Sequence, residues 1–374
     1  MYTFIKKIVI FVIPIGSIFI FPVVVLYLSR EYYSIKNIVS IQMTKPETIY
    51  GPIYSGLDYE YKKLLIREKN PEIVVLGASR AMEFRQEFFK DPEKFVNGSA
   101  SLANYALDRI EKFVENLPKD SNVKFVIFSL DQEMFRVPPS FLDNDDAIYK
   151  PSPSEWFMDA WRIVYLDEFF GKFSFNDLYA KSGKTTNIGM NAILQNNGFR
   201  FDGSYQYEKV LHDPNYENNT KNLIDAEYEK IISNRSIFKY STTVSEDPFP
   251  IIDKILEISQ KKGITTIGFL SPYPSKLYVQ FTSKDDLYTK IARELTTRLE
   301  NEFSRYNYNF FDFSDIRIIG GNDNEFVEAS HGTDKLSLRM IIYMAEKCWL
   351  LNQYVDINKL KMMLKNNPGG FLNF

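Results

Sequence analysis

Two segments far apart in the chain carry side chains that could act together as a nucleophile and its base. Ser79 comes two residues after a short apolar run, where a serine presents its hydroxyl at the start of a helix. Glu328 and His331 lie near the other end of the chain, three residues apart. A serine nucleophile needs a base, and the base needs a group that fixes its tautomer. This spacing therefore predicts Ser79 as nucleophile, His331 as base and Glu328 as the orienting acid.

Each of these residues also has a simpler interpretation. Serine is among the best helix N-caps, so Ser79 could cap a helix without chemistry. His331 could be a loop histidine bonded to backbone. The second histidine, His212, lies in a polar loop where packing in a turn is the favoured interpretation. With Cys348 as the single cysteine, the chain lacks the ligand spacing of a metal site, and we expect neither a metal nor a cofactor.

Three further residues are candidates for binding a substrate. Tyr273 follows an apolar run over residues 264–270, although residues 271–274 could simply form a rigid loop. Arg200 lies in an alternating run over residues 198–205, for which a hairpin is the alternative. Arg80 could hold an anionic group or pair with an acid.

The pattern of apolar runs indicates the fold that must position these residues. It predicts strands over 72–77, 95–97, 123–130, 264–270 and 310–313, and helices over 80–89, 102–117, 251–262, 287–306 and 335–350. Alternating strands and helices imply an α/β fold with a parallel sheet between two helical layers. Ligands bind such sheets at the carboxyl ends of the strands.

The remaining segments suggest how the chain is divided. Residues 71–135 and 247–352 are expected to form the α/β domain. Residues 136–246 break the alternation and are interpreted as a cap insertion over one end of the sheet. Residues 31–70 are expected to be a stalk, because proline and glycine interrupt them, and residues 353–374 a C-terminal tail.

The N-terminal region predicts a membrane anchor. Residues 8–28 contain no charge, and a helix of that length reaches about 30 Å, the thickness of a bilayer core. No small-residue cleavage site follows, so an uncleaved single-pass anchor over residues 1–30 is favoured over a removed signal peptide. Basic residues flank both ends of the run and barely decide its orientation.

Composition excludes several classes of function. The 374 residues are 45% hydrophobic and 25% charged, as in ordinary globular proteins. Forty-five Lys and Arg against 48 Asp and Glu give a net charge of −3, with no basic stripe. Nucleic acid is therefore not an expected partner.

Four short blocks resemble those of the SGNH (GDSL-like) hydrolases. They occur in the family's order: Gly77-Ala78-Ser79, Asn97-Gly98-Ser99, Ser129-Leu130-Asp131-Gln132 and Glu328-Ala329-Ser330-His331. The resemblance covers roughly residues 71–135 and 250–350. In layout the chain is similar to anchored proteins of alginate acetylation and teichoic-acid D-alanylation. The resemblance implies an SGNH/flavodoxin-like sandwich, the Ser79–His331–Glu328 triad, and the backbone N–H groups of Gly98 and Ser79 as oxyanion donors.

The blocks depart from the family at three positions. The first reads Gly-Ala-Ser instead of Gly-Asp-Ser, and the acid is Glu328 instead of the usual Asp. Asp131 stands where an oxyanion-stabilising Asn is expected, so it should point elsewhere or be protonated. Gln132 could supply a donor instead, although strand alternation would direct it to the other side.

Together these patterns lead to two hypotheses. The first is a membrane-anchored, outward-facing serine esterase or O-acyltransferase that acts on a cell-envelope glycan. Transfer would imply a membrane-bound O-acyltransferase as partner. The second is a non-catalytic, membrane-tethered glycan-binding or assembly factor on the same scaffold.

Overall fold

The structure is a computed structural model of the chain. It describes residues 16, 18–53, 58–100, 106–135, 158, 161–166, 171, 174–233, 243–283 and 286–373. Within these ranges, no helix is both long and apolar enough to cross a membrane. Residues 8–15 and 17 of the anchor expected over residues 8–28 lie outside the described ranges.

The chain divides into two compact units. The first unit comprises Met1–Leu57, Ile148–Phe201 and Gln206–Lys209. The second, called the sheet unit here, comprises Asp58–Ala147, Asp202–Tyr205 and Val210–Phe374. These boundaries differ from those expected, because the cap insertion of residues 136–246 is shared between the units.

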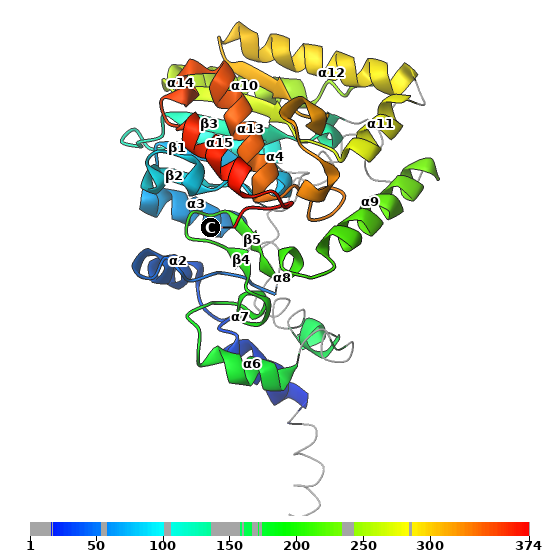
Figure 1. The fold of residues 1–374 in the computed structure, drawn as a ribbon. Coiled ribbons are helices and arrows are strands. Elements are labelled where there is room, and N and C mark those ends of the chain that lie inside the picture. Colours follow the sequence, from blue (N-terminus) through cyan, green and yellow to red (C-terminus); the bar gives the residue numbers. More distant parts are fainter. Residues whose placement is uncertain are drawn as a thin grey trace, which may run out of the picture. The chain divides into compact units, whose positions relative to one another are not determined.

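Five parallel strands form the centre of the sheet unit (Figure 1). They are β1 (Ile73–Leu76), β2 (Phe95–Asn97), β3 (Phe125–Leu130), β6 (Thr265–Leu270) and β7 (Asn309–Asp312). Their order is β2-β1-β3-β6-β7. Val75 of β1 lies opposite both Asn97 and Ile127, so β1 is flanked by β2 and β3. The five predicted strands are confirmed.

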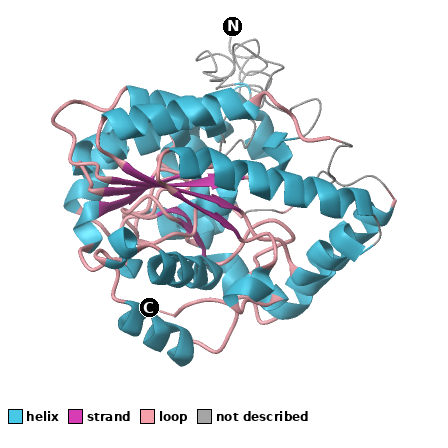
Figure 2. Ribbon diagram, turned by 90° about the horizontal axis from the view of Figure 1, so that it is seen from above, coloured by secondary structure: helices cyan, strands magenta, loops and turns pink. Residues whose placement is uncertain are grey.

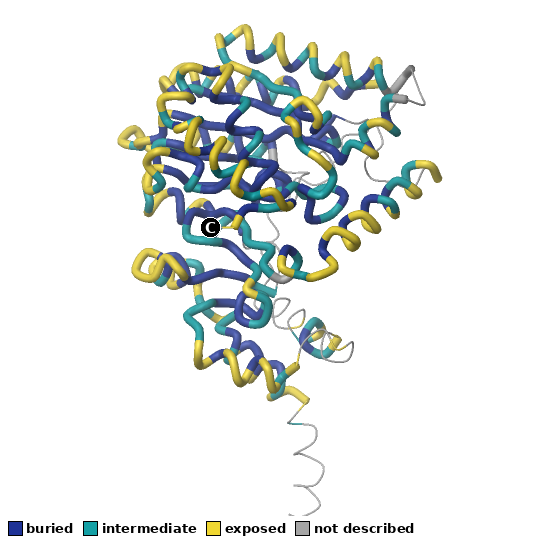
Figure 3. Tube along the Cα trace, in the orientation of Figure 1, coloured by how far each residue is buried: buried dark blue, intermediate teal, exposed yellow. Residues whose placement is uncertain are grey.

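Helices cover both faces of this sheet, as Figure 2 shows. On one face α13 (Asp334–Lys347), α14 (Trp349–Asn352) and α15 (Ile357–Asn366) pack in one apolar cluster with side chains such as Val75 and Phe269. On the other side α4 (Ala106–Glu115), α10 (Pro248–Lys261) and α12 (Asp286–Arg305) contact one another or the sheet. Phe303 of α12 lies so close to Gly268 that no Cβ would fit there. Burial on both faces explains the almost entirely apolar strands β1 and β3, whereas the edge strand β7 has no buried residue (Figure 3).

The helix expected over residues 80–89 is wrong. The segment forms two short 3-10 turns, η1 (Ser79–Ala81) and η2 (Gln86–Phe88). Asn97 provides the physical reason, because its amide donates to the carbonyl oxygens of Ala81 and Phe84 at 2.9 and 3.0 Å. In an α-helix those carbonyls would accept from the residues four positions later. The helix-dipole argument for Ser79 is therefore lost.

The expected stalk and tail contain regular structure. The stalk holds α2 (Ile35–Thr44) in the first unit and α3 (Asp58–Lys69) in the sheet unit. The tail holds α15, and its end packs against α13: Leu372 N–H donates to Asp334 at 3.0 Å. The sheet unit also contains α9 (Tyr216–Ile232), α11 (Ser275–Ser283) and the short turns η3 (Pro92–Lys94), η5 (Gln132–Phe135), η6 (Ile316–Ile319) and η7 (Asp323–Glu325).

The first unit is mainly helical. Its elements include α2, α6 (Phe175–Ser182), α7 (Met190–Gln195) and β4 (Asn197–Phe199). The unit boundaries fall within β5 (Tyr205–Tyr207), the strand that pairs with β4, and within α8 (Glu208–Leu211). Residues 18–28 and 161–166 are helical as well. A small apolar cluster joins the helix of residues 18–28 to the rest: Val25, Leu26, Val164, Leu178, Met190 and Ile193.

Candidate active site

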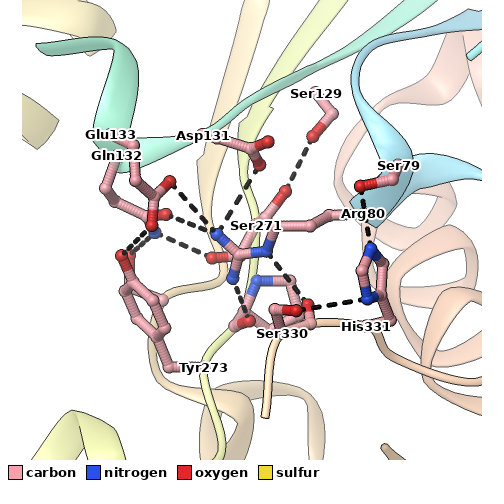
Figure 4. A network of polar contacts seen from close by, with 12 residues as sticks. Ser79, Arg80, Ser129, Asp131, Gln132, Glu133, Ser271, Tyr273, Ser330 and His331 are labelled. Carbon is pink, nitrogen blue, oxygen red and sulfur yellow. Dashed lines mark hydrogen bonds and ion pairs between the residues drawn. The ribbon is translucent and has the colours of Figure 1, made fainter. Parts of the chain in front are cut away.

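Ser79, His331 and Glu328 form a continuous hydrogen-bonded chain at the carboxyl edge of the sheet. The Ser79 Oγ lies 2.8 Å from Nε2 of His331. On the other side of the ring, Nδ1 lies 2.5 Å from Oε1 of Glu328. Figure 4 shows the Ser79 hydroxyl and the imidazole pointing toward each other. Ser79 and His331 are partly exposed, so a substrate can reach the nucleophile.

A glycine shapes the turn that presents Ser79. Gly77 follows β1 with a backbone φ of +151°, a conformation that residues with a side chain rarely adopt. A Cβ at this position would lie 2.7 Å from the Cβ of Ser129 on the neighbouring strand. The glycine thus lets the backbone turn tightly against β3 and places Ser79 beyond the end of the sheet.

The loop with Glu328 and His331 is closed at its base. Phe326 and Gly332 form an antiparallel bridge, and Val327 N–H donates to the His331 carbonyl at 2.8 Å. Both ends of the loop are therefore held while the acid and the base project from it. Glu325, which immediately precedes Phe326, is fully buried and accepts two hydrogen bonds from Arg339, at 2.7 and 2.9 Å.

Two more elements of the sheet unit support this loop. From α9, the Tyr216 hydroxyl donates to the Phe326 carbonyl at 2.5 Å. From the C-terminal segment, the Gly370 carbonyl accepts from the Thr333 hydroxyl at 2.7 Å. Thr333 stands at the N-cap position of α13, but its side chain makes no cap hydrogen bond. The loop is therefore fixed by residues distant in sequence.

Electrostatics favour the ionised form of the orienting acid. The hydrogen bond from His331 lowers the pKa of Glu328 to about 2, against the opposing effect of burial. Sequence reasoning missed Ser330, whose hydroxyl donates to Oε1 of Glu328 at 2.7 Å and lies 3.1 Å from Nδ1 of His331. In the sequence, its position between Glu328 and His331 is the feature that could have indicated this role. Ser330 helps to fix the rotamer of an acid one methylene longer than Asp.

Two of the three expected oxyanion donors are engaged elsewhere. Gly98 N–H donates to the Val75 carbonyl at 2.7 Å. The Gln132 amide donates to the Ser271 carbonyl at 2.7 Å and to the Ser314 hydroxyl at 2.8 Å. Both assignments are therefore wrong, because those donors hold strand ends together.

The third expected donor is placed differently. No described residue accepts a hydrogen bond from the Ser79 backbone N–H. Because this N–H belongs to the nucleophile itself, it can donate to an oxyanion formed there.

Arg80 is a buried structural residue, which corrects its assignment to substrate binding. Its guanidinium donates to the Ser330 carbonyl at 3.2 Å, to Oε1 of Gln132 at 3.0 Å and to the Pro272 carbonyl. It lies 4.8 Å above the ring of Tyr273. Tyr273 is itself 1% exposed, so its substrate-binding assignment is also wrong.

Asp131 faces Arg80. The two side chains are 2% and 5% exposed, and Oδ1 of Asp131 lies 3.6 Å from the guanidinium. Glu133 lies 3.8 Å from it on the same side. Burial lowers the pKa of Arg80, but Asp131, Glu133 and Tyr273 together outweigh this effect and raise that pKa above its ordinary value. Asp131 thus points toward the Arg80 guanidinium (Figure 4). Of the two expectations for Asp131, that it points elsewhere or is protonated, this orientation fits the first.

The ends of β3 and β6 are joined by a further contact that sequence reasoning missed. The buried hydroxyls of Ser129 and Ser271 lie 2.7 Å apart. Ser129, the one polar residue of an otherwise apolar strand, is the signal that could have indicated it. Arg200 belongs to the first unit, where its Nε donates to Gln206 at 3.2 Å, and its role in substrate binding stays a prediction.

Comparison of the chain with family models, curated proteins and solved structures found no match. Function is therefore argued from the site alone.

Proposed function

We propose that the protein is a membrane-anchored serine esterase or O-acyltransferase of SGNH-like type that acts on acyl groups of a cell-envelope glycan. The observation that carries the proposal is the hydrogen-bonded chain from Ser79 through His331 to Glu328. These residues come from opposite ends of the sequence, and a simple N-cap serine has no need of a histidine and a carboxylate aligned behind it.

In the proposed mechanism His331 removes the Ser79 proton at Nε2 as Oγ attacks the acyl carbonyl carbon. Glu328 accepts a hydrogen bond from Nδ1 and stabilises the imidazolium that forms. The Ser79 N–H donates to the oxyanion. Collapse of the tetrahedral intermediate breaks the bond to the leaving alcohol, which takes the proton from His331. The acyl-Ser79 ester then passes to water or to a sugar hydroxyl by the same steps.

The cellular setting belongs to the proposal as well. It rests on the uncharged run of residues 8–28 and on the order of the four blocks. The anchor would hold an outward-facing catalytic unit near its glycan. Transfer to a sugar would need an acyl donor delivered through the membrane, for which a membrane-bound O-acyltransferase is the expected partner.

Labelling with a fluorophosphonate probe tests the proposal, because the probe phosphonylates activated serines. We expect the full-length protein to be labelled, Ser79→Ala to lose labelling, and His331→Ala to label far more slowly. Ser304→Ala, at an exposed serine on α12, is the matched control and should label normally. A folded protein that is not labelled would refute the esterase and transferase proposal.

One observation favours a non-catalytic alternative. The Gly98 and Gln132 donors expected for the oxyanion are engaged, and Asp131 occupies the position of the third block's Asn. The alternative is a tethered glycan-binding or assembly factor on the same scaffold. It predicts no probe labelling together with binding of an envelope glycan that persists in Ser79→Ala.

A further inference from the structure

Residues 369–372, called the strap here, are held by three consecutive side chains at the start of α13, directly after the loop of residues 326–332. These side chains are 0%, 2% and 4% exposed, and each bonds a main-chain group of the strap. The hydrogen bonds run from Thr333 Oγ1 to the Gly370 carbonyl at 2.7 Å, from Lys335 Nζ to the Gly369 carbonyl at 2.5 Å, and from Leu372 N–H to Oδ1 of Asp334 at 3.0 Å. Because buried polar groups need their partners, the strap and the start of α13 should hold their positions together.

These contacts take the place of an ordinary helix cap. A threonine at an N-cap usually accepts a hydrogen bond from a backbone N–H of the first turn. Thr333 makes no such bond, and its hydroxyl donates to the strap instead. The two charged neighbours also have partners within the sheet unit, Asp334 with Arg85 at 3.2 Å and Lys335 with Glu325 at 3.5 Å. The start of α13 is therefore fixed by tertiary contacts, and the strap is one of them.

The strap also lies against the residue that leads into the loop. A Cβ on Gly370 would lie 2.0 Å from the Asn324 carbonyl oxygen, so a glycine is needed for this close approach. The Tyr216 hydroxyl donates to the same oxygen at 3.0 Å, and its ring meets that of Phe371 edge-on with centroids 5.7 Å apart. Gly370 thus lies against the chain on both sides of the loop, at Asn324 before it and at Thr333 after it.

We propose that Gly370 and Thr333 are positioning residues of the active site, which hold both ends of the loop so that His331 stays in line with Ser79. The lever is short, because His331 precedes Thr333 by two positions and its Nε2 lies 2.8 Å from the Ser79 hydroxyl. The inference rests on the proposed function. It deepens that function by assigning a role in it to a segment that supplies no reacting group.

Two neighbouring glycines provide a matched pair of variants in the full-length protein. Gly370→Ala forces the strap away from the Asn324 carbonyl, whereas a Cβ on Gly369 would meet nothing within 4 Å. A misplacement of about 1 Å can cost 10²-fold in rate. We therefore expect fluorophosphonate labelling of Ser79 to slow by about tenfold to 10²-fold in Gly370→Ala and to stay unchanged in Gly369→Ala.

Thr333 gives a second test with its own rescue, which also serves if Gly370→Ala does not fold. Thr333→Val removes the hydroxyl and should slow labelling several-fold, while Thr333→Ser keeps the donor and should restore most of the rate. Leu256→Ala, at a fully buried position on α10, is the control for stability alone. It should unfold at a lower urea concentration and still be labelled normally.

The ¹⁵N NMR signal of the His331 imidazole reports its alignment without any reaction. The shift of Nε2 depends on whether the Ser79 hydroxyl donates to it, and Ser79→Ala gives the value without that bond. His212 is the only other histidine, so His212→Gln assigns the signal. We expect Gly370→Ala and Thr333→Val to move the shift toward the Ser79→Ala value, and Gly369→Ala to leave it in place.

Unchanged labelling and an unmoved Nε2 shift in folded Gly370→Ala and Thr333→Val would overturn the inference and leave the proposed function standing. Labelling that slows as much in Leu256→Ala would also overturn it, because lost stability would then explain the rate. An unmodified protein that is not labelled would refute the proposed function instead. In that case a moved Nε2 shift would still support the positioning of His331 by the strap, and an unmoved one would overturn it.

Discussion

Replacing Arg80 by methionine separates the stability of the sheet unit from the reactivity of Ser79. The substitution keeps an unbranched side chain but removes the charge and all the guanidinium donors. It leaves Asp131 buried, with its side chain 2% exposed, and without the cation 3.6 Å away. It also removes the donor to the Ser330 carbonyl, next to His331.

The magnitude follows from the burial of the pair. Breaking a buried ion pair by removing one partner costs about 3–5 kcal/mol, because an uncompensated charge remains. We expect Arg80→Met to lose that much free energy of unfolding in urea denaturation. Arg305→Met is the control, since that arginine is 56% exposed and its surface ion pairs should contribute about 1 kcal/mol or less.

Reactivity should fall for a different reason. Without its bond to Arg80, the Ser330 carbonyl is released and His331 is less well aligned with the Ser79 hydroxyl. A misplacement of about 1 Å can cost 10²-fold in rate, so we expect probe labelling of Ser79 to slow by about tenfold to 10²-fold. Arg80→Lys keeps a charge but cannot bridge three carbonyl and amide oxygens, and it should be intermediate.

A double variant provides the decisive comparison. Arg80→Met with Asp131→Asn removes both charges, so it should recover most of the lost stability. Labelling should stay slow, because the Ser330 carbonyl still lacks its donor. Labelling of this variant at the rate of the unmodified protein would refute the positioning role of Arg80. A stability loss of Arg80→Met no larger than that of Arg305→Met would refute the buried ion pair.

Four further predictions concern three other residues of the sheet unit. Gly77→Ala should destabilise the protein by about 1–3 kcal/mol in urea denaturation, because a positive φ strains alanine and its Cβ would meet Ser129. Glu328→Gln should slow labelling by up to about 10⁴-fold, as His331 loses the carboxylate that fixes its tautomer. Glu328 has its pKa lowered to about 2 from 4.5, so its contribution to stability is present above about pH 4.5 and is lost as pH falls toward 2. Burial lowers the pKa of Lys62 to about 7, so the folded state holds this proton more weakly than the unfolded chain, and stability should rise between about pH 7 and 10.5.

Each of these predictions has a matched comparison. Gly183→Ala, where a Cβ would meet nothing within 4 Å, should leave stability nearly unchanged. Exposed Glu300→Gln should not alter labelling, and Glu328→Gln should abolish the acid-dependent difference between pH 4.5 and 2. Lys62→Met should remove the rise at alkaline pH, and an identical rise in that variant would contradict the lowered pKa.

Much of the fold was predictable because the sheet is buried on both faces. Apolar runs such as residues 73–76 and 265–270 have no solvent-facing alternation to obscure them, and the proline or glycine at their ends marks the turns. The carboxyl edge of a parallel sheet then suggested that Ser79 and His331 would meet. That expectation needs only the strand order, not the details of each loop.

The errors occurred where tertiary contacts replace local preference. The helix after Ser79 fails because the Asn97 amide takes two carbonyls that a helix would use. Arg80 looked like a ligand-binding residue because sequence does not indicate which acids surround it. Gly98 was assigned from its block, yet its N–H donates to the neighbouring strand. In each case the interacting residues are farther apart in the sequence than the three or four positions that helix periodicity relates or the two that strand alternation relates.

The arrangement of donors around Ser79 has a kinetic consequence. Of the three donors expected for an oxyanion, only the Ser79 N–H has no acceptor among the described residues. Loss of one such donor costs about 10²–10³ in rate in a protease. Both formation and breakdown of an acyl-Ser79 ester pass through an oxyanion, so both steps should be slow. Attack by water and attack by a sugar hydroxyl form the same kind of oxyanion, so the missing donors should slow hydrolysis and transfer alike, and the acyl-Ser79 ester should persist long enough to be trapped with either acceptor.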